Sequence, residues 1–467
     1  MRRRSPGIAL ALAGLGAAAL AGCSGGGDGA ASTNATSTAP AGPQLEALDG
    51  DTRKPVAGAM VTVFTKKGKQ TPVEIADVRS LPAAATRVRV DAAGYTVGQA
   101  AVAKDGGPVR VLMYRPALQS PEYGGGPART RYVPAVKVPR PGNRKPRWTF
   151  DARTLIEFPP AVKNGLAVFG VNSGRVFALD ARTGKVRWAR RQKSYIASTP
   201  AIAGPRVYVT SMDGMLTAYR VNDGKKTFQF STGGSPVESS PLVVGDLAYF
   251  GTWKGTLYAI NLRTGKPKWT FQAAADIKAS AVLAGGNIVV GDYAGNVYAL
   301  NPRTGAQVWR ASVGQRFYGG AGFANGTVVI GDVGGAVIAL DAADGREKWR
   351  HSTGGAYVYS SPAIADGTVY IGDFNGRFMA LSLANGAQRW SFDAGGRISG
   401  SATVVGDTVY TSVLTRPGEP KRTYGLSRRT GREVFRTDDG RYSPAVAAGT
   451  TLFLVGTRRL YAYPAAP

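Results

Sequence analysis

The sequence has a single cysteine, a single histidine and few acidic residues, with 30 Asp and Glu against 58 Lys and Arg in 467 residues. With Cys23 alone, the chain cannot build an internal disulfide framework. With His351 alone, it can build neither a Ser-His-Asp triad nor a histidine-rich zinc site, and we expect this histidine at the surface. The longest apolar run, residues 8–20, is too short to span a bilayer as a stable helix. These shortages exclude disulfide scaffolds and the common hydrolase and zinc-enzyme sites.

The N-terminus has the charge and hydrophobicity order of a secretory signal peptide. Three arginines precede the apolar run, which leads into Leu20-Ala-Gly-Cys23. This ending resembles the lipobox of bacterial lipoproteins. The resemblance implies cleavage before Cys23 and attachment of a lipid such as palmitate to its sulfur. The alternative is a plain signal peptide with a stray cysteine. We predict a signal peptide at 1–22 and a flexible tether at 23–44. The protein would be exported and lipid-anchored to a bacterial membrane, with its folded part in the periplasm or on the cell surface.

An aromatic residue recurs every 40 or 41 positions from residue 188 to residue 390, and a fixed period of this length indicates a solenoid or a propeller. The residues are Trp188, Phe228, Trp269, Trp309, Trp349 and Trp390. Within one unit, four short apolar runs are separated by three glycine-bearing turns, which is typical of a propeller blade. We interpret the aromatic series as blade packing rather than as a stack for a cofactor.

Two further aromatic residues, Trp148 and Phe435, extend the series to eight. The last unit lacks its own fourth strand, whereas residues 146–150 form an anchor strand without a blade. We therefore expect this strand to complete the last blade, so that the ring has no open sheet edge. The predicted fold is all-β: an eight-bladed β-propeller at 144–467 with terminal-strand closure, preceded by a small β-sandwich.

Residues 45–116 alternate apolar and polar residues between frequent turns, which predicts the small β-sandwich. The stretches PVAGAMV (55–61) and VDAAGY (90–95) resemble the carboxypeptidase-regulatory-like modules, which are immunoglobulin-like sandwiches. No residues there have catalytic spacing, so we expect a spacer or adhesive role. Residues 117–143 are rich in Pro, Gly and basic residues and predict an extended linker whose charges keep it solvated.

The repeat units VFALDARTGKVRW (176–188), LYAINLRTGKPKW (257–269) and VYALNPRTGAQVW (297–309) resemble the pyrroloquinoline-quinone (PQQ) type of propeller repeat. This repeat occurs in quinoprotein dehydrogenases, which use the quinone and calcium. It also occurs in BamB-type lipoproteins of the outer-membrane β-barrel assembly machinery. The second resemblance implies an eight-bladed, non-enzymatic scaffold.

The residues required by quinoprotein chemistry separate these two families. The quinoprotein resemblance implies adjacent cysteines beside the cofactor, but no cysteine follows Cys23. It also implies a calcium site of Glu, Asn and Asp oxygens with a carboxylate base. Asp292, Asp332 and Asp373 each lie in a Gly-Asp-x-x-Gly turn, and turn chemistry accounts for them without a metal. We expect no catalytic residue, no metal and no cofactor; a PQQ-dependent oxidoreductase is the alternative.

The formal net charge of +28 favours anionic partners such as lipid headgroups or wall polymers. Nucleic acid is not expected as a partner of an exported lipoprotein. Basic residues such as Arg182, Arg263 and Arg303 are scattered over turns, so the charge indicates either a solvated surface or a binder of anionic cell-wall or surface polymers. Both interpretations stay open at this stage.

The best candidate for a binding site is a pair of columns just before the first strand of each blade, because first strands line the central channel of a propeller. At most equivalent positions of the repeats, the side chains are of one chemical type. The side chains in these two columns vary, as expected either of a ligand site at the channel mouth or of a solvent-exposed position. Aromatic, Arg and Glu side chains suit a protein partner. The candidates are Glu157, Tyr195, Glu238, Asp276, Lys278, Arg316, Tyr318, Tyr357, Tyr359, Arg397 and Arg441. We thus expect a monomeric envelope scaffold similar to BamB, which binds envelope proteins, an assembly machinery among them.

Overall fold

The computed structural model describes residues 42–75, 80–134, 145–414, 421–442 and 444–464. The predicted signal peptide, the lipidation site Cys23 and most of the tether lie outside these residues. The described chain is built from β-strands, with a short 3-10 turn at Pro116–Leu118. None of its helical segments has the length and hydrophobicity of a membrane span.

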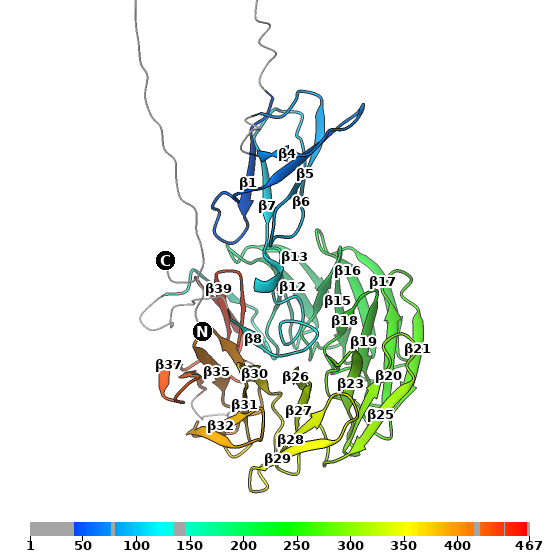
Figure 1. Ribbon diagram of the computed structural model, residues 1–467, viewed down its shortest axis with the longest axis vertical. Helices are drawn as coiled ribbons and strands as arrows, with labels where there is room; N and C mark the ends of the chain where they lie inside the picture. Colours follow the sequence, from blue (N-terminus) through cyan, green and yellow to red (C-terminus); the bar gives the residue numbers. More distant parts are fainter. Residues whose placement is uncertain (1–41, 76–79, 135–144, 415–420, 443, 465–467) are drawn as a thin grey trace, which may run out of the picture. The chain divides into compact units, whose positions relative to one another are not determined.

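Eight blades, each with four antiparallel strands, follow one another along the described chain and succeed each other around a ring in Figure 1; the sheet of blade 7 has β8 as a fifth strand. Blade 1 consists of β10 (Ala161–Lys163), β11 (Leu166–Gly170), β12 (Arg175–Asp180) and β13 (Val186–Arg191). Blade 2 consists of β14 (Ala201–Ala203), β15 (Arg206–Ser211), β16 (Met215–Arg220) and β17 (Lys226–Ser231). Blade 3 consists of β18 (Leu242–Val244), β19 (Leu247–Gly251), β20 (Thr256–Asn261) and β21 (Pro267–Gln272). Blade 4 consists of β22 (Val282–Ala284), β23 (Asn287–Gly291), β24 (Asn296–Leu300) and β25 (Gln307–Ser312). Blades 5 and 6 are β26 (Gly322–Ala324), β27 (Thr327–Gly331), β28 (Ala336–Asp341) and β29 (Glu347–Ser352), then β30 (Ala363–Ala365), β31 (Thr368–Gly372), β32 (Arg377–Ser382) and β33 (Gln388–Asp393). Blade 7 is β34 (Thr403–Val405), β35 (Thr408–Ser412), β36 (Thr423–Ser427) and β37 (Glu433–Thr437), and blade 8 is β38 (Ala445–Ala448), β39 (Thr451–Val455), β40 (Arg459–Pro464) and β9 (Trp148–Asp151).

The ring closes through the strand that the sequence left without a blade. β9 pairs with β40, with Trp148 opposite Ala462 and Phe150 opposite Leu460. One buried cluster joins residues of blade 8, such as Phe453, to residues of blade 1, such as Phe169. The predicted pairing of the first anchor strand with the last blade is therefore present, and it supplies the fourth strand of blade 8.

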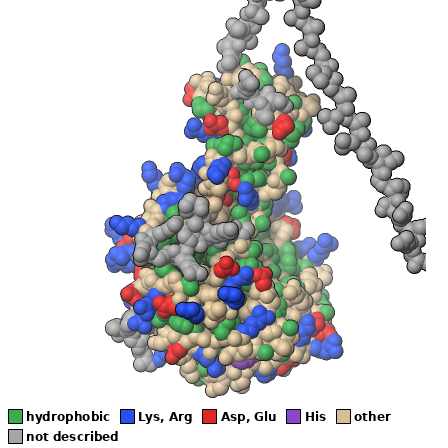
Figure 2. Space-filling view, turned by 60° about the vertical axis from the view of Figure 1, so that its left-hand side comes forward, with side chains coloured by type: hydrophobic (Ala, Val, Ile, Leu, Met, Phe, Trp, Pro, Cys, Tyr) green, Lys and Arg blue, Asp and Glu red, His purple; other side chains and the backbone are tan. Residues whose placement is uncertain are grey.

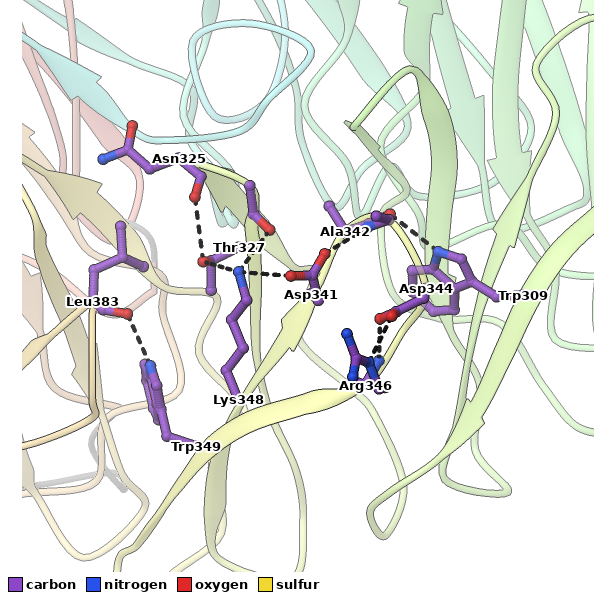
Figure 3. A network of polar contacts seen from close by, with 12 residues as sticks. Trp309, Asn325, Thr327, Asp341, Ala342, Asp344, Arg346, Lys348, Trp349 and Leu383 are labelled. Carbon is purple, nitrogen blue, oxygen red and sulfur yellow. Dashed lines mark hydrogen bonds and ion pairs between the residues drawn. The ribbon is translucent and has the colours of Figure 1, made fainter.

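The recurring tryptophans attach six of the blades to the next one by an indole hydrogen bond, and the other two anchors are Phe228 and Phe435. The indole N–H of Trp309 donates to the carbonyl oxygen of Ala342 at 3.1 Å, and that of Trp349 donates to Leu383 at 2.8 Å (Figure 3). The glycine of the following turn packs on the same ring: a Cβ added to Gly386 would lie 2.6 Å from Cε3 of Trp349. This glycine also has φ of +71°, a conformation that only glycine adopts without strain. The Trp and the Gly of the repeat thus form one packing unit across each blade interface.

The N-terminal module forms two sheets that share a core. β1 (Leu45–Asp49) pairs in parallel with β7 (Val109–Met113). The other sheet contains β2 (Met60–Thr65), β3 (Gly68–Lys69), β4 (Val73–Glu74), β5 (Ala85–Asp91) and β6 (Gly98–Ala101). Buried Leu45, Val63, Val88 and Val111 belong to one cluster that joins both sheets. This arrangement has the two layers of a small sandwich; the carboxypeptidase-regulatory-like resemblance stays a prediction.

Residues 119–133, the inner segment, lie along the first strands of the propeller. Their backbone contacts run from blade to blade, and β8 (Tyr132–Val133) adds a parallel strand to β34. Carbonyl oxygens of this segment accept hydrogen bonds from first-strand N–H groups of blades 1, 2, 4, 5, 6 and 7: Ser120 from Val162, Pro121 from Ile202, Pro127 from Leu283, Ala128 from Phe323, Thr130 from Ile364, and Arg131 from Val404. Otherwise these inner strand edges would be buried with unpaired N–H groups.

The prediction that the charges of this segment are solvated is wrong for Arg129 and Arg131, which are buried. The guanidinium of Arg129 donates to three backbone carbonyls, those of Tyr123, Ser240 and Ala281. These acceptors offset the loss of water around the charge. The composition alone suggested a linker. Pro, Gly and Arg are equally compatible with a segment whose backbone carbonyls accept hydrogen bonds from strand edges, so composition does not separate the two.

Candidate functional site

A cavity lies at the propeller axis between the inner segment and the channel mouth. Tyr123 of the inner segment forms its floor, with its hydroxyl 2.8 Å from Oγ of Ser401. The inner column is the candidate column three residues before the Pro or Ala that begins each first-strand run, and the outer column lies two residues earlier. Five candidate residues of the inner column line the walls of the cavity: Glu157, Glu238, Lys278, Tyr318 and Tyr359. They come from blades 1, 3, 4, 5 and 6 and converge because each precedes the first strand of its blade.

The two carboxyl groups of the cavity have different surroundings. Glu238 accepts hydrogen bonds from the hydroxyl of Tyr318 at 2.5 Å and from the indole N–H of Trp253 at 3.2 Å. No such donor to Glu157 is found among the described residues; burial, followed by the nearby charge of Glu238, raises the pKa of Glu157 to about 7. Burial and the charge of Glu238 also raise the pKa of Tyr318, so this hydroxyl remains a donor. The cavity therefore holds one fixed carboxylate and one carboxyl group that titrates near neutral pH.

Aromatic rings form a continuous band from the cavity to the mouth. Tyr318 and Tyr359 have ring centroids 5.0 Å apart, and Tyr359 is 4.9 Å from Phe374. Tyr357, which is 47% exposed, is 5.9 Å from Tyr359. Tyr293 continues the band on the other side, 6.4 Å from Tyr318. Such edge-to-face contacts keep the rings in fixed positions.

Cations lie against this band rather than in open solvent. Nζ of Lys278 is 3.9 Å from the ring centroid of Trp253 and 4.6 Å from that of Tyr293. The guanidinium of Arg397 lies 5.2 Å from the centroid of Phe374. These are cation–π distances. We refer to Trp253, Tyr293, Tyr318, Tyr357, Tyr359 and Phe374 as the aromatic band.

The analysis of the sequence missed three members of the band, namely Trp253, Tyr293 and Phe374. Each occupies the same position of the repeat, two residues after the glycine that ends the second strand, where blade 5 has Val333. The backbone N–H of this residue bonds to the outer column: Tyr293 to Asp276, and Phe374 to Tyr357. A comparison of the repeats at the second turn would have found these residues.

The outer column contributes less to the cavity. Tyr357 belongs to the band and Arg397 contacts it, whereas Asp276 and Arg316 are not among the lining residues. Tyr195 is exposed in blade 2, outside the band. The remaining candidate, Arg441, has its guanidinium 5.5 Å from the ring of Tyr442, which does line the cavity. The structure thus brings the inner column together and spreads the outer column around the rim.

The turn aspartates have the contacts that turn chemistry predicts. Asp292 accepts from the N–H groups of Ala294 and Asn296 and from the hydroxyl of Tyr298. Asp332 accepts from the N–H of Ala336 at 2.7 Å. The single histidine of the chain, His351, is half-buried on β29, and burial lowers its pKa. In the described ranges, no three His, Cys, Asp or Glu side chains are grouped as metal ligands would be.

The cavity does not match the quinone and calcium of the quinoproteins. Its volume is about 60 Å³, well below the roughly 300–1,000 Å³ of typical small-molecule pockets. Its carboxyl groups, Glu157 and Glu238, are accompanied in the lining by Ser, Tyr and Lys rather than by the Asn and Asp that complete a calcium site. The residues present therefore do not fit this cofactor pair.

The family model for outer membrane protein assembly factor BamB matches residues 135–296 and 293–467. The chain belongs to this family. Among curated proteins, BamB of Moranella endobia (strain PCIT) is 28% identical over 127 residues, which are 24% of this chain and 33% of that protein. The match thus spans about a third of that relative's length.

Solved structures agree on the fold. BamB from Moraxella catarrhalis superposes with a TM-score of 0.50 at 22% identity, covering 57% of this chain and 85% of that one. A quinohemoprotein alcohol dehydrogenase from Comamonas testosteroni superposes with a TM-score of 0.62 at 14% identity, covering 74% and 80%. At these identities the likeness concerns the fold alone, so function has to be argued from the site.

Proposed function

We propose that this protein is a non-enzymatic envelope scaffold whose channel mouth binds a segment of a partner protein. The aromatic band carries the proposal: rigid Tyr, Trp and Phe side chains beside Lys278, Arg397 and Glu238 have the composition of protein-binding hot spots. The exposed ring of Tyr357 offers the first contact at the mouth.

The family membership favours an envelope protein as the partner, and a component of an outer-membrane assembly machinery as the first candidate. We further propose that Cys23 carries a lipid anchor, that the chain acts as a monomer in the periplasm or on the cell surface, and that it needs no cofactor. The small cavity supports the absence of a bound quinone, because the space between Tyr123 and the mouth is already filled by side chains.

Site-specific photocrosslinking in intact cells tests the scaffold function. A photoreactive phenylalanine analogue at Tyr357 should capture a defined envelope protein. The same analogue at Val308, which is equally exposed on the outer strand of blade 4, is the matched control. Capture of the same proteins from both positions would contradict a binding site at the mouth. Quinone and calcium added to the purified protein should leave no bound chromophore after gel filtration.

A further inference from the structure

The repeats can be compared with each other at their blade interfaces. The aromatic anchor of each blade lies in its fourth strand. The residue two positions after this anchor faces the third strand of the next blade. At four interfaces this contact is an edge-to-face aromatic pair with ring centroids 5.0–5.2 Å apart. The pairs are Phe150–Phe177, Phe230–Tyr258, Phe271–Tyr298 and Phe392–Tyr424. They fill the outer part of these interfaces with apolar surface.

The interface between blades 1 and 2 is one of the four that lack this pair; at the other three, the residue two positions after the anchor is Ala311, His351 or Thr437. Arg190 follows the anchor Trp188 by two residues, and Thr217 stands in the third strand of blade 2. A groove with a volume of about 620 Å³ opens beside Arg190, and Gln229, which donates to the hydroxyl of Thr217, also lines it. Its lining includes Arg190, Arg191, Gln192, Lys193, Tyr219, Lys226 and Gln229. The volume lies within the range of small-molecule pockets.

The guanidinium of Arg190 is held in place by backbone carbonyls. It donates to Gly224 at 2.8 Å, to Asp223 at 2.5 Å and to Ala189 at 2.7 Å. These bonds use three of its five N–H donors, so two are left for a ligand. Nζ of Lys226 is 3.5 Å from Oε1 of Gln229, a long contact that leaves its other donors free. The groove therefore presents a fixed planar donor beside a mobile ammonium group.

Cations outnumber acids around this groove. Four lining residues are basic, whereas Asp213 is the acidic one among the residues that line it. Oδ1 of Asp213 accepts from the hydroxyl of Ser211 at 2.6 Å. The carboxylate of Asp223, on the adjoining turn, is already paired with Arg220. The lining thus carries four positive charges against the one negative charge of Asp213, and Asp223, which also attracts Arg190, is paired with Arg220.

We propose that this groove between blades 1 and 2 is a binding site for a phosphate group, carried by a lipid headgroup or by a soluble phosphoester. A fixed guanidinium provides the forked donors that phosphate oxygens accept. The excess of positive charge selects an anion, and the open outer side leaves room for the rest of the ligand. The site is separate from the channel mouth and does not depend on the scaffold function.

The test uses the mature chain with Cys23→Ser, so that no lipid anchor contributes to binding. At low ionic strength, where screening is weak, titration calorimetry with inorganic phosphate and with glycerol 3-phosphate measures the soluble source. Co-sedimentation with vesicles of phosphatidylcholine containing phosphatidylglycerol, against phosphatidylcholine alone, measures the lipid source. Binding in one arm identifies that source, and binding in both shows that the phosphate group suffices.

The double variant Arg190→Phe with Thr217→Tyr introduces the aromatic pair that four of the other interfaces have. We expect it to fold with unchanged or higher thermal stability and to bind at least about tenfold more weakly, a change of about 1.4 kcal/mol. Arg263→Gln removes one exposed charge in a turn of blade 3 and should leave binding within about twofold of the original. Equal losses in both variants, or no saturable binding in either arm, would overturn the proposal.

Discussion

The hydroxyl of Tyr318 in blade 5 donates a 2.5 Å hydrogen bond to Oε1 of Glu238 in blade 3. The second oxygen of this carboxylate accepts from Trp253. A charge that would otherwise be poorly solvated inside the cavity is thereby held between two aromatic donors from different blades. The mouth of the channel is consequently a preorganised surface, and its side chains need not rearrange to receive a partner.

Replacing Tyr318 by Phe tests this arrangement. The variant removes one charge-assisted hydrogen bond to Glu238, and we expect the free energy of unfolding in urea to fall by about 1–3 kcal/mol. Tyr195→Phe removes a hydroxyl from an exposed residue of the outer column and should change the stability by less than about 0.5 kcal/mol. Equal effects of the two variants would show that the bond to Glu238 contributes nothing.

The carboxyl group of Glu157 predicts a pH dependence. Its folded-state pKa of about 7 lies above the ordinary Glu value of 4.5, so the folded state binds more protons than the unfolded state between these pH values. The free energy of unfolding should therefore fall as pH rises from about 4.5 to about 7. Glu157→Gln should flatten this decline in urea titrations at pH 5, 6 and 7.5. Buried Glu122, whose pKa burial also raises to about 7, would keep part of it. An unchanged slope in Glu157→Gln would contradict the assignment.

The turn glycines allow conformational strain to be separated from steric clash. Gly386 and Gly354 have φ of +71° and +73°, but only a Cβ on Gly386 would meet the ring of Trp349. We expect Gly354→Ala to cost about 1 kcal/mol through backbone strain alone. Gly386→Ala should cost clearly more, because the ring and the turn must also move apart. Thermal unfolding of both variants measures the difference, and equal costs would show that the contact with Trp349 is unimportant.

Arg129 tests the role of the inner segment. Arg129→Ala leaves three backbone carbonyls without their donor and empties a fully buried site. We expect a loss of about 2–4 kcal/mol in equilibrium unfolding and faster cleavage of residues 119–133 in limited proteolysis. Arg263→Ala, an exposed arginine of a turn, is the control and should behave like the unsubstituted protein. An unaffected Arg129→Ala would mean that the segment is held by its backbone contacts alone.

The sequence predicted the repeat well because blade packing imposes the same side chain at the same position in each unit. The Trp–Gly unit at Trp349 and Gly386 is an example, and the pairing of β9 with β40 followed from one anchor without a blade. The inner column was also accessible, because its position before each first strand sets where its side chains meet. Its binding role stays a prediction.

The inner segment could not be found in this way, and half of the aromatic band was missed although a comparison of the repeats would have revealed it. Residues 119–133 have no period, and they contact the first strands through backbone hydrogen bonds. Every residue type has a backbone carbonyl that can accept such a bond, as Pro121 and Pro127 do. Nothing in the order of Pro, Gly and Arg distinguishes such a segment from a solvated linker. Tyr293 and Phe374 were accessible in principle, but each lies in what resembles an ordinary Gly-Asp hairpin turn until the blades are compared position by position. Figure 2 shows one face of the protein, on which Lys and Arg form several separate groups with Asp and Glu between them, as their scatter over the turns predicted.

The floor formed by Tyr123 makes the axial channel a dead end. A polypeptide cannot be threaded through this ring, and nothing that enters at Tyr357 can leave on the opposite side. A partner can therefore dock only by inserting a loop tip, a terminus or a few side chains, and release must retrace the route of entry.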